Sequence, residues 1–126
     1  MPVIFWVAAG GAIGSAARHL VNVLAGRVMG FEFPWGTLVV NVVGCLAMGL
    51  FIGIATVKMP ISAEVRAFVT TGILGGFTTF SAFSLDFATL AERREFSSAV
   101  LYGVGSVGLS LVAVFLGLWL VRQLAS

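Results

Sequence analysis

The chain has 126 residues, of which 60% are hydrophobic and 10% are charged, and its formal net charge is +2 at pH 7. A soluble domain carries roughly a quarter of its residues as charged side chains. Seven basic and five acidic residues are therefore too few to cover a water-facing surface, and the composition predicts an integral membrane protein. The small positive charge gives no indication of nucleic acid, and no nucleic-acid partner is expected.

Four apolar segments are each long enough to cross a bilayer as a helix, which takes about 20 residues. They are predicted at residues 3–24, 37–57, 67–90 and 96–121. The loops between them are short and polar, so residues 1–126 are expected to form a single four-helix transmembrane domain. The first segment lacks the basic residues that precede the apolar core of a signal peptide, and we expect it to be retained.

The basic residues that normally choose the orientation of a membrane protein are divided between the two sides. Four spans place three of them on the side of the termini, namely Lys58, Arg66 and Arg122. The other side receives Arg27, Arg93 and Arg94, together with Arg18 if it lies toward that end of its span. This balance fits insertion in both orientations and antiparallel pairing, although one orientation set by a small bias fits it as well.

A dimer is also favoured by the size of the bundle, because four helices of this length fill their own interior with side chains. Pairs of glycines four residues apart allow close helix contact, within or between subunits. These pairs are Gly10 with Gly14, Gly49 with Gly53, and Gly72 with Gly76.

Polar side chains inside the spans are costly in lipid unless they face a partner or water, so each is a functional candidate. In the last segment Tyr102, Ser106 and Ser110 recur every four residues and share one helical face. Thr37 and Asn41 share a face of the second segment in the same way. A serine or threonine can instead bond only to its own backbone, but the amide of Asn41 has both a donor and an acceptor to satisfy.

The third segment contains an unusual run at residues 72–84, GILGGFTTFSAFS. Gly75 and Gly76 each lower helix propensity by roughly 1 kcal/mol relative to alanine, and the hydroxyls that follow can satisfy freed backbone groups. We expect the helix to break near mid-span. Such a break exposes amides that attract anions and carbonyls that can bind a cation.

Phe80 and Phe83 follow this break and stand three residues apart, so both rings project from one side if the helix resumes there. The rim of an aromatic ring is positive, and two rings that meet an anion edge-on can contact it without a formal charge. The alternative is lipid contact or packing, which accounts for most of the eleven phenylalanines of the chain.

Enzymatic activity is not expected, because no cluster of nucleophile, base and acid and no metal-ligand spacing is visible around the single histidine, His19, and the single cysteine, Cys45. Cys45 is interpreted as a small residue between helices. A four-helix multidrug exporter is the main alternative function, but it would need a carboxylate in its first span, and Asp86 lies in the third. A purely structural membrane subunit would leave the polar face of the last segment unexplained.

With these landmarks the sequence resembles the Fluc family of fluoride channels, also called CrcB-type proteins, over essentially the whole chain. The matching stretches are GGAIGSAAR at 10–18, PWGTLVVN at 34–41 with Gly44, TTGILGGFTTFSAFS at 70–84, and Tyr102, Ser106 and Ser110. The resemblance implies an antiparallel, dual-topology homodimer in the bacterial inner membrane. It also implies passive export of cytoplasmic fluoride along two pathways at the subunit interface, with a structural sodium ion at the dimer centre.

The resemblance also implies roles for individual residues. Phe80 and Phe83 match the aromatic pair of the fluoride pathway, and the expected pathway set is completed by Asn41, Tyr102, Ser106, Ser110, Thr37 and Thr79. Gly75 and Thr78 match the backbone carbonyl ligands of sodium, and Arg18 matches the arginine of the aqueous vestibule. The chain differs from the family pattern at Ala82, where threonine is common, and at Asp86, where glutamate is common; Asp86 stays a candidate for the pore.

Overall fold

The computed structural model describes residues 2–57 and 60–125, and within these residues the regular structure is entirely helical. Four stretches are long and apolar enough to cross a membrane, which confirms the predicted four-span, all-helical membrane architecture. The loops at residues 30–34 and 93–95 lie wholly within the described residues. Lys58, one of the basic residues weighed for the orientation, lies outside them.

The first two spans are single helices, α1 (Val3–Met29) and α2 (Trp35–Val57), and the fourth is α6 (Phe96–Ala125). The third candidate span, Ala63–Glu92, combines four shorter elements. They are α3 (Ala63–Arg66), η1 (Ala67–Leu74), α4 (Gly75–Phe77) and α5 (Ser81–Glu92). The helices run past several of the limits predicted from hydropathy, because backbone hydrogen bonding continues where the apolar composition ends.

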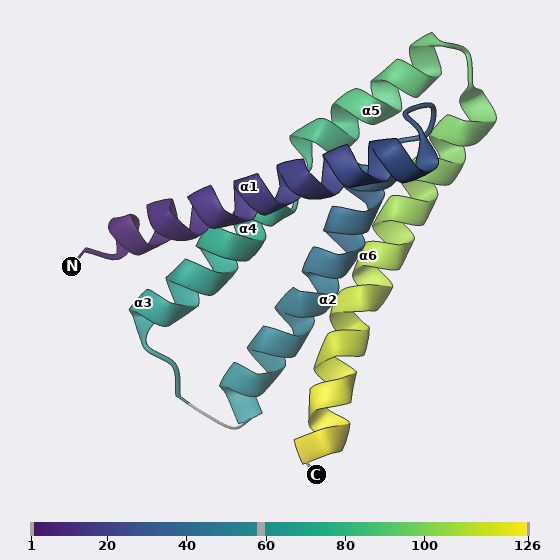
Figure 1. Cartoon of the computed structure of the whole chain (residues 1–126). Coiled ribbons are helices and arrows are strands. Elements are labelled where there is room, and N and C mark those ends of the chain that lie inside the picture. Colours follow the sequence, from purple (N-terminus) through teal and green to yellow (C-terminus); the bar gives the residue numbers. More distant parts are fainter. Residues whose placement is uncertain (1, 58–59, 126) are drawn as a thin grey trace.

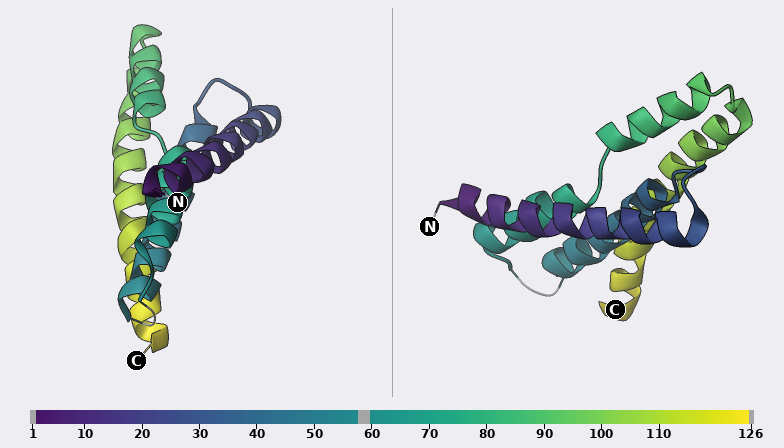
Figure 2. Two further views of the ribbon diagram at one scale, coloured as in Figure 1. Left: turned by 90° about the vertical axis from the view of Figure 1, so that its left-hand side faces the viewer. Right: turned by 45° about the horizontal axis from the view of Figure 1, so that its top comes forward.

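The helices form two main packed pairs (Figure 1). α2 and α6 run side by side over most of their length, while α1 crosses them and lies against η1 and α4. After α4 the chain turns away from α1, and α5 packs instead against the beginning of α6, as the two further views show (Figure 2). The third span therefore begins in one helix pair and ends beside the other.

Close contact in both pairs depends on glycine. A Cβ atom added at Gly14 would overlap the carbonyl oxygen of Ile73, and one added at Gly49 would overlap the carbonyl oxygen of Val114. Backbones approach this closely only where no side chain intervenes. The predicted glycine pairs thus make contacts within the subunit, a point that their spacing in the sequence left open.

The third span has two irregular features. The first is η1, a π-helix of 8 residues, after which the amide of Gly75 still donates to the carbonyl of Thr70, five residues back. The second is a bend after Phe77, where Thr78 takes an extended conformation with φ −87° and ψ 160° before α5 begins at Ser81. π-helical turns are uncommon and concentrate at functional sites.

Two loops meet at one end of the molecule. α1 ends at Met29 and is followed by Gly30, whose φ of +82° lies in the left-handed region that glycine adopts without strain. Arg93, in the turn between α5 and α6, donates from Nη2 to the carbonyl oxygen of Glu32, at 3.0 Å, in the loop between α1 and α2. The contact places both loops on the same side of the membrane, as four alternating spans require.

The glycine contact between α1 and the third span can be tested with two alanine substitutions on one helix. Gly14→Ala is expected to lower the free energy of unfolding by about 1–3 kcal/mol, the usual cost of overpacking, because the new methyl group meets the backbone of Ile73. Gly11→Ala is the matched control, since no atom lies within 4 Å of its added Cβ. Thermal unfolding in detergent, followed by tryptophan fluorescence, measures the difference, and equal midpoints for the two variants would contradict the packing.

Candidate functional site

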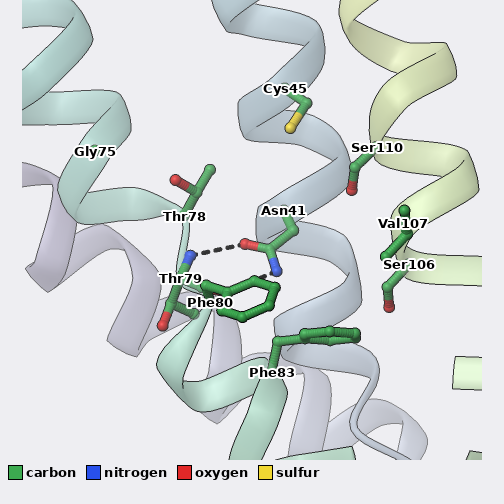
Figure 3. Close-up of a pocket in the computed structure, with 10 residues that line it drawn as sticks. All are labelled: Asn41, Cys45, Gly75, Thr78, Thr79, Phe80, Phe83, Ser106, Val107 and Ser110. Carbon is green, nitrogen blue, oxygen red and sulfur yellow. Dashed lines mark hydrogen bonds between the residues drawn. The ribbon is translucent and has the colours of Figure 1, made fainter. Parts of the chain in front are cut away.

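The bend in the third span is held by the side chain of Asn41, which projects from α2. Its Nδ2 donates to the carbonyl oxygen of Thr79 at 2.9 Å, and its Oδ1 accepts from the amide of Thr79 at 2.8 Å. The amide group thus pairs with both backbone groups of one residue, as a neighbouring β-strand would (Figure 3). In an apolar environment each of these backbone groups would otherwise cost several kcal/mol if left unpaired.

Other side chains satisfy the backbone on either side of the bend. Arg18 of α1 donates from Nε to the carbonyl oxygen of Gly76 at 3.0 Å, at the end of α4. The hydroxyl of Thr79 accepts from the amide of Ala82 at 3.1 Å and so caps the start of α5. Several backbone groups next to the bend are therefore paired with side chains, although residues 78–80 are not helical.

A cavity of about 360 Å³ lies where the bend faces α2 and α6. Its wall combines an amide, hydroxyls, two phenyl rings and a thiol, and none of the described lining residues is charged. The lining residues are Asn41, Cys45, Gly75, Thr78, Thr79, Phe80, Phe83, Ser106, Val107 and Ser110. Figure 3 shows the serines of α6 on the opposite side of the cavity from the bend.

Ser106 has a property that matters for the chemistry of this cavity. Its side chain is 4% exposed, and its Oγ has no hydrogen-bond partner among the described residues. A buried hydroxyl without a partner is unfavourable by about 1–3 kcal/mol. Because Ser106 also lines the cavity, a polar occupant of the cavity would supply the missing hydrogen bond.

The two phenylalanines after the bend both line the cavity, with ring centroids 5.5 Å apart and planes inclined by 47°. The two rings differ in how many other rings they contact. The ring centroid of Phe83 lies 5.1 Å from that of Tyr102, and the centroid of Tyr102 lies 5.5 Å from that of Phe33 in an edge-on arrangement. Phe80 is 75% exposed. Phe83 is therefore fixed by an aromatic series, whereas Phe80 faces the outside of the subunit.

Tyr102 does not line the first cavity, and its hydroxyl is hydrogen-bonded to the carboxylate of Asp86. It is 1% exposed, and its hydroxyl donates to Oδ2 of Asp86 at 3.1 Å. Asp86 and Thr37 line a second, smaller cavity of about 190 Å³ near the loop between α1 and α2, together with Asn22. The polar face predicted for the last span is thus divided, because Ser106 and Ser110 reach the first cavity and Tyr102 is directed toward the second.

The structure brings most of the residues singled out in the sequence to the bend or the first cavity. Arg18 lies at the end of α4, while Thr37, Tyr102 and Asp86 lie toward the second cavity. No pattern in the sequence singles out Asn22 or places Cys45 and Val107 in a cavity wall. The one available signal for Cys45 was its position one helical turn after Asn41.

The matches with known proteins agree with this arrangement. Residues 5–118 match the family described as "CrcB-like protein, Camphor Resistance (CrcB)". The chain belongs to the CrcB-like family. The match includes most of each of the four spans and all the lining residues of the first cavity, so the family pattern and the cavity involve the same helices.

Several curated members of the CrcB-like family are similar to the chain over nearly its whole length. The protein named "Fluoride-specific ion channel FluC" from Mesorhizobium japonicum is 56% identical over 118 residues, which are 94% of this chain and 94% of that protein. The proteins of the same name from Chelativorans sp. and Rhizobium etli are 52% and 55% identical, again over 94% of each chain. Membership of this family, with four apolar helices, identifies a multi-pass bacterial membrane protein and favours a channel over a multidrug exporter.

The clamp made by Asn41 can be tested by hydrogen exchange. In Asn41→Ala the amide of Thr79 loses its acceptor, and a loss of about 1.4 kcal/mol of protection corresponds to about tenfold faster exchange. We expect faster exchange in peptides that cover residues 78–82, measured by mass spectrometry in detergent. Ser110→Ala, on the opposite wall of the cavity, serves as the control and should leave these peptides unchanged. Equal exchange in the two variants would contradict the clamp.

Proposed function

We propose that the chain is a fluoride channel that lets cytoplasmic fluoride leave the cell passively across the bacterial membrane. The main observation in support is the uncharged cavity beside the bend, whose wall combines the phenyl rings of Phe80 and Phe83 with the hydroxyl of Ser106, which has no partner among the described residues. The fluoride-specific channel name of the relatives from Mesorhizobium japonicum and Chelativorans sp. supports the same ion. No enzymatic step is part of the proposal.

Fluoride holds its water more tightly than any other halide, so leaving water costs it the most free energy. A pathway has to replace that hydration with short contacts. The hydroxyls of Ser106 and Ser110 and the Nδ2 group of Asn41 are directed donors, and they are set in rigid helices. Short contacts to these donors favour the smallest halide, because a larger anion cannot approach them as closely.

The absence of a charged group among the described lining residues of this cavity is part of the proposed mechanism. An arginine or lysine in the wall would bind fluoride strongly and slow its release, whereas conduction requires binding that is weak enough to reverse. The positive rims of Phe80 and Phe83 provide attraction without a fixed charge. Arg18 lies outside the cavity wall, because its Nε is directed to Gly76, and we assign it to the entrance and to support of the bend.

We further propose that two copies assemble as an antiparallel homodimer, with the bend breaking the third span inside the bilayer. Phe80 is 75% exposed although it lines the cavity, so a single copy leaves one side of the pathway open. A second copy would close it. The near-equal distribution of basic residues on the two sides allows the two opposite orientations that such a pair needs.

A structural sodium ion at the dimer centre is consistent with the chemistry of the bend. The amide of Thr79 would donate to the carbonyl of Gly75 in a continuous helix, but it donates to Asn41 instead. The carbonyl oxygen of Gly75 thus loses that donor, and the carbonyl of Thr78 belongs to the extended residue at the bend. Carbonyl oxygens of unwound helices are suitable ligands for sodium, so Gly75 and Thr78 are the residues that would hold it and thereby join two copies.

Fluoride flux from liposomes that contain the purified protein tests the proposed function. Fluoride efflux should greatly exceed chloride efflux under the same gradient, because the hydroxyl and amide groups in the cavity wall replace the water of the smaller ion. An ion-selective electrode follows each ion. No fluoride efflux, or equal efflux of the two ions, would refute the channel proposal.

The aromatic contact to the ion can be tested with two phenylalanines of similar exposure. Phe80→Ile removes the positive ring rim and should lower fluoride flux by up to about tenfold, which corresponds to a barrier higher by about 1.4 kcal/mol. Phe115→Ile, at a residue that is 68% exposed on α6 and away from the cavity, is the matched control and should keep its flux. A similar loss of flux in both variants would show that the effect is unrelated to the cavity.

The antiparallel assembly predicts that the C-terminus is found on both sides of the membrane. A cytoplasmic reporter and a periplasmic reporter fused after residue 126 should each be active, because each orientation is present in every dimer. A strongly cationic substitution in one loop, such as Ser62→Arg, provides a control that should shift the ratio. Activity of only one reporter with the native sequence would contradict dual topology.

A further inference from the structure

Cys45 is the only cysteine of the chain, and it lies in the wall of the cavity. It stands one helical turn after Asn41 on α2 and is half-buried. Figure 3 shows its sulfur atom directed toward the level of Asn41, on the side of α2 nearer to Thr78. We propose that Cys45 is a covalent modification site for small, neutral, thiol-directed reagents, and that the resulting adduct obstructs the cavity.

A second feature of the same cavity indicates that the thiol can be reached. The hydroxyl of Ser106 is 4% exposed and has no partner among the described residues, although it lines this cavity. Such a group indicates that the cavity receives water or another polar occupant. The cavity has a volume of about 360 Å³ and its wall includes Phe80, which is 75% exposed, so a small reagent can enter from outside the subunit and reach the thiol of Cys45.

The chemistry requires only the thiol and the reagent. With an alkyl methanethiosulfonate, the thiolate of Cys45 attacks the alkyl-bearing sulfur and forms a disulfide bond. The bond between that sulfur and the sulfonyl group breaks, methanesulfinate leaves with the electron pair, and the thiol proton passes to water. The cysteine sulfur is oxidised and the reagent is reduced, and a dithiol later reverses the reaction by thiol–disulfide exchange.

The position of Cys45 determines the effect of the adduct. The cavity has a volume of about 360 Å³ and lies between the bend and α6. An alkyl group attached at Cys45 occupies part of this cavity, beside Asn41, where the proposed ion pathway runs. The obstruction therefore rests on the proposed function, whereas the reactivity of Cys45 from within the cavity does not.

The experiment treats the full-length protein in liposomes with methyl or benzyl methanethiosulfonate and measures fluoride efflux relative to the untreated sample of the same protein. We expect the benzyl adduct to lower efflux by about tenfold or more, the methyl adduct to lower it less, and dithiothreitol to restore it. Cys45→Ser is the matched control, because its hydroxyl does not react with the reagent. Intact-mass measurement counts the adducts in each sample.

A second measurement is independent of flux. Ser110→Phe fills the cavity from the wall of α6 and should slow the modification of Cys45 by about tenfold. Val112→Phe, at an exposed residue of the same helix that does not line the cavity, should leave the rate unchanged. The rates are followed by mass spectrometry in detergent.

The outcomes separate this inference from the channel proposal. If the untreated protein transports no fluoride, the proposed function fails, and the rates in Ser110→Phe and Val112→Phe still decide whether the thiol faces the cavity. Complete modification of Cys45 with unchanged fluoride efflux would overturn the inference. So would modification that occurs only after denaturation, or equal rates in the two phenylalanine variants.

Discussion

The double hydrogen bond between the side chain of Asn41 and the backbone of Thr79 is the interaction on which the cavity depends. Lipid offers no hydrogen bonds, so a helix that bends in the bilayer needs new partners for every backbone group that it frees. An amide side chain is suited to this, because one planar group carries both a donor and an acceptor. With this pair in place, the residues after the bend can turn their side chains toward α6.

The packing of α1 supports the same bend from the other side. Glycine contacts bring α1 against η1 and α4, as the overlap at Gly14 shows, and Arg18 can then reach the carbonyl of Gly76. A larger residue at position 44 would also disturb the bend, since a Cβ there would overlap the methyl group of Thr78. Glycines at positions 14 and 44 therefore help to define the shape of the cavity, although neither of them lines it.

Much of the architecture could be predicted from the sequence, because apolar length and the scarcity of charge define membrane spans regardless of tertiary detail. Asn41 could be selected because burying a polar side chain in lipid costs free energy. The phenylalanine pair could be selected because it follows the glycine-rich run of the third span. The partner of Asn41 could not be predicted, since it is a backbone group 38 residues away. Nor could the π-helix or the contact between Tyr102 and Asp86, because both depend on how the third span packs, which local composition does not determine.

The two clamps of the bend come from helices that precede it in the chain, and this order bears on how the protein is made. Arg18 and Asn41 are synthesised before residues 75–79, and membrane domains acquire structure from the N-terminus as they emerge. A newly inserted third segment on its own has no partner for the carbonyl of Gly76 or for either backbone group of Thr79. The bend therefore forms when the third segment assembles with the first two helices, and not when it is inserted. In a nascent chain that lacks those helices, the third segment would remain an unbent helix.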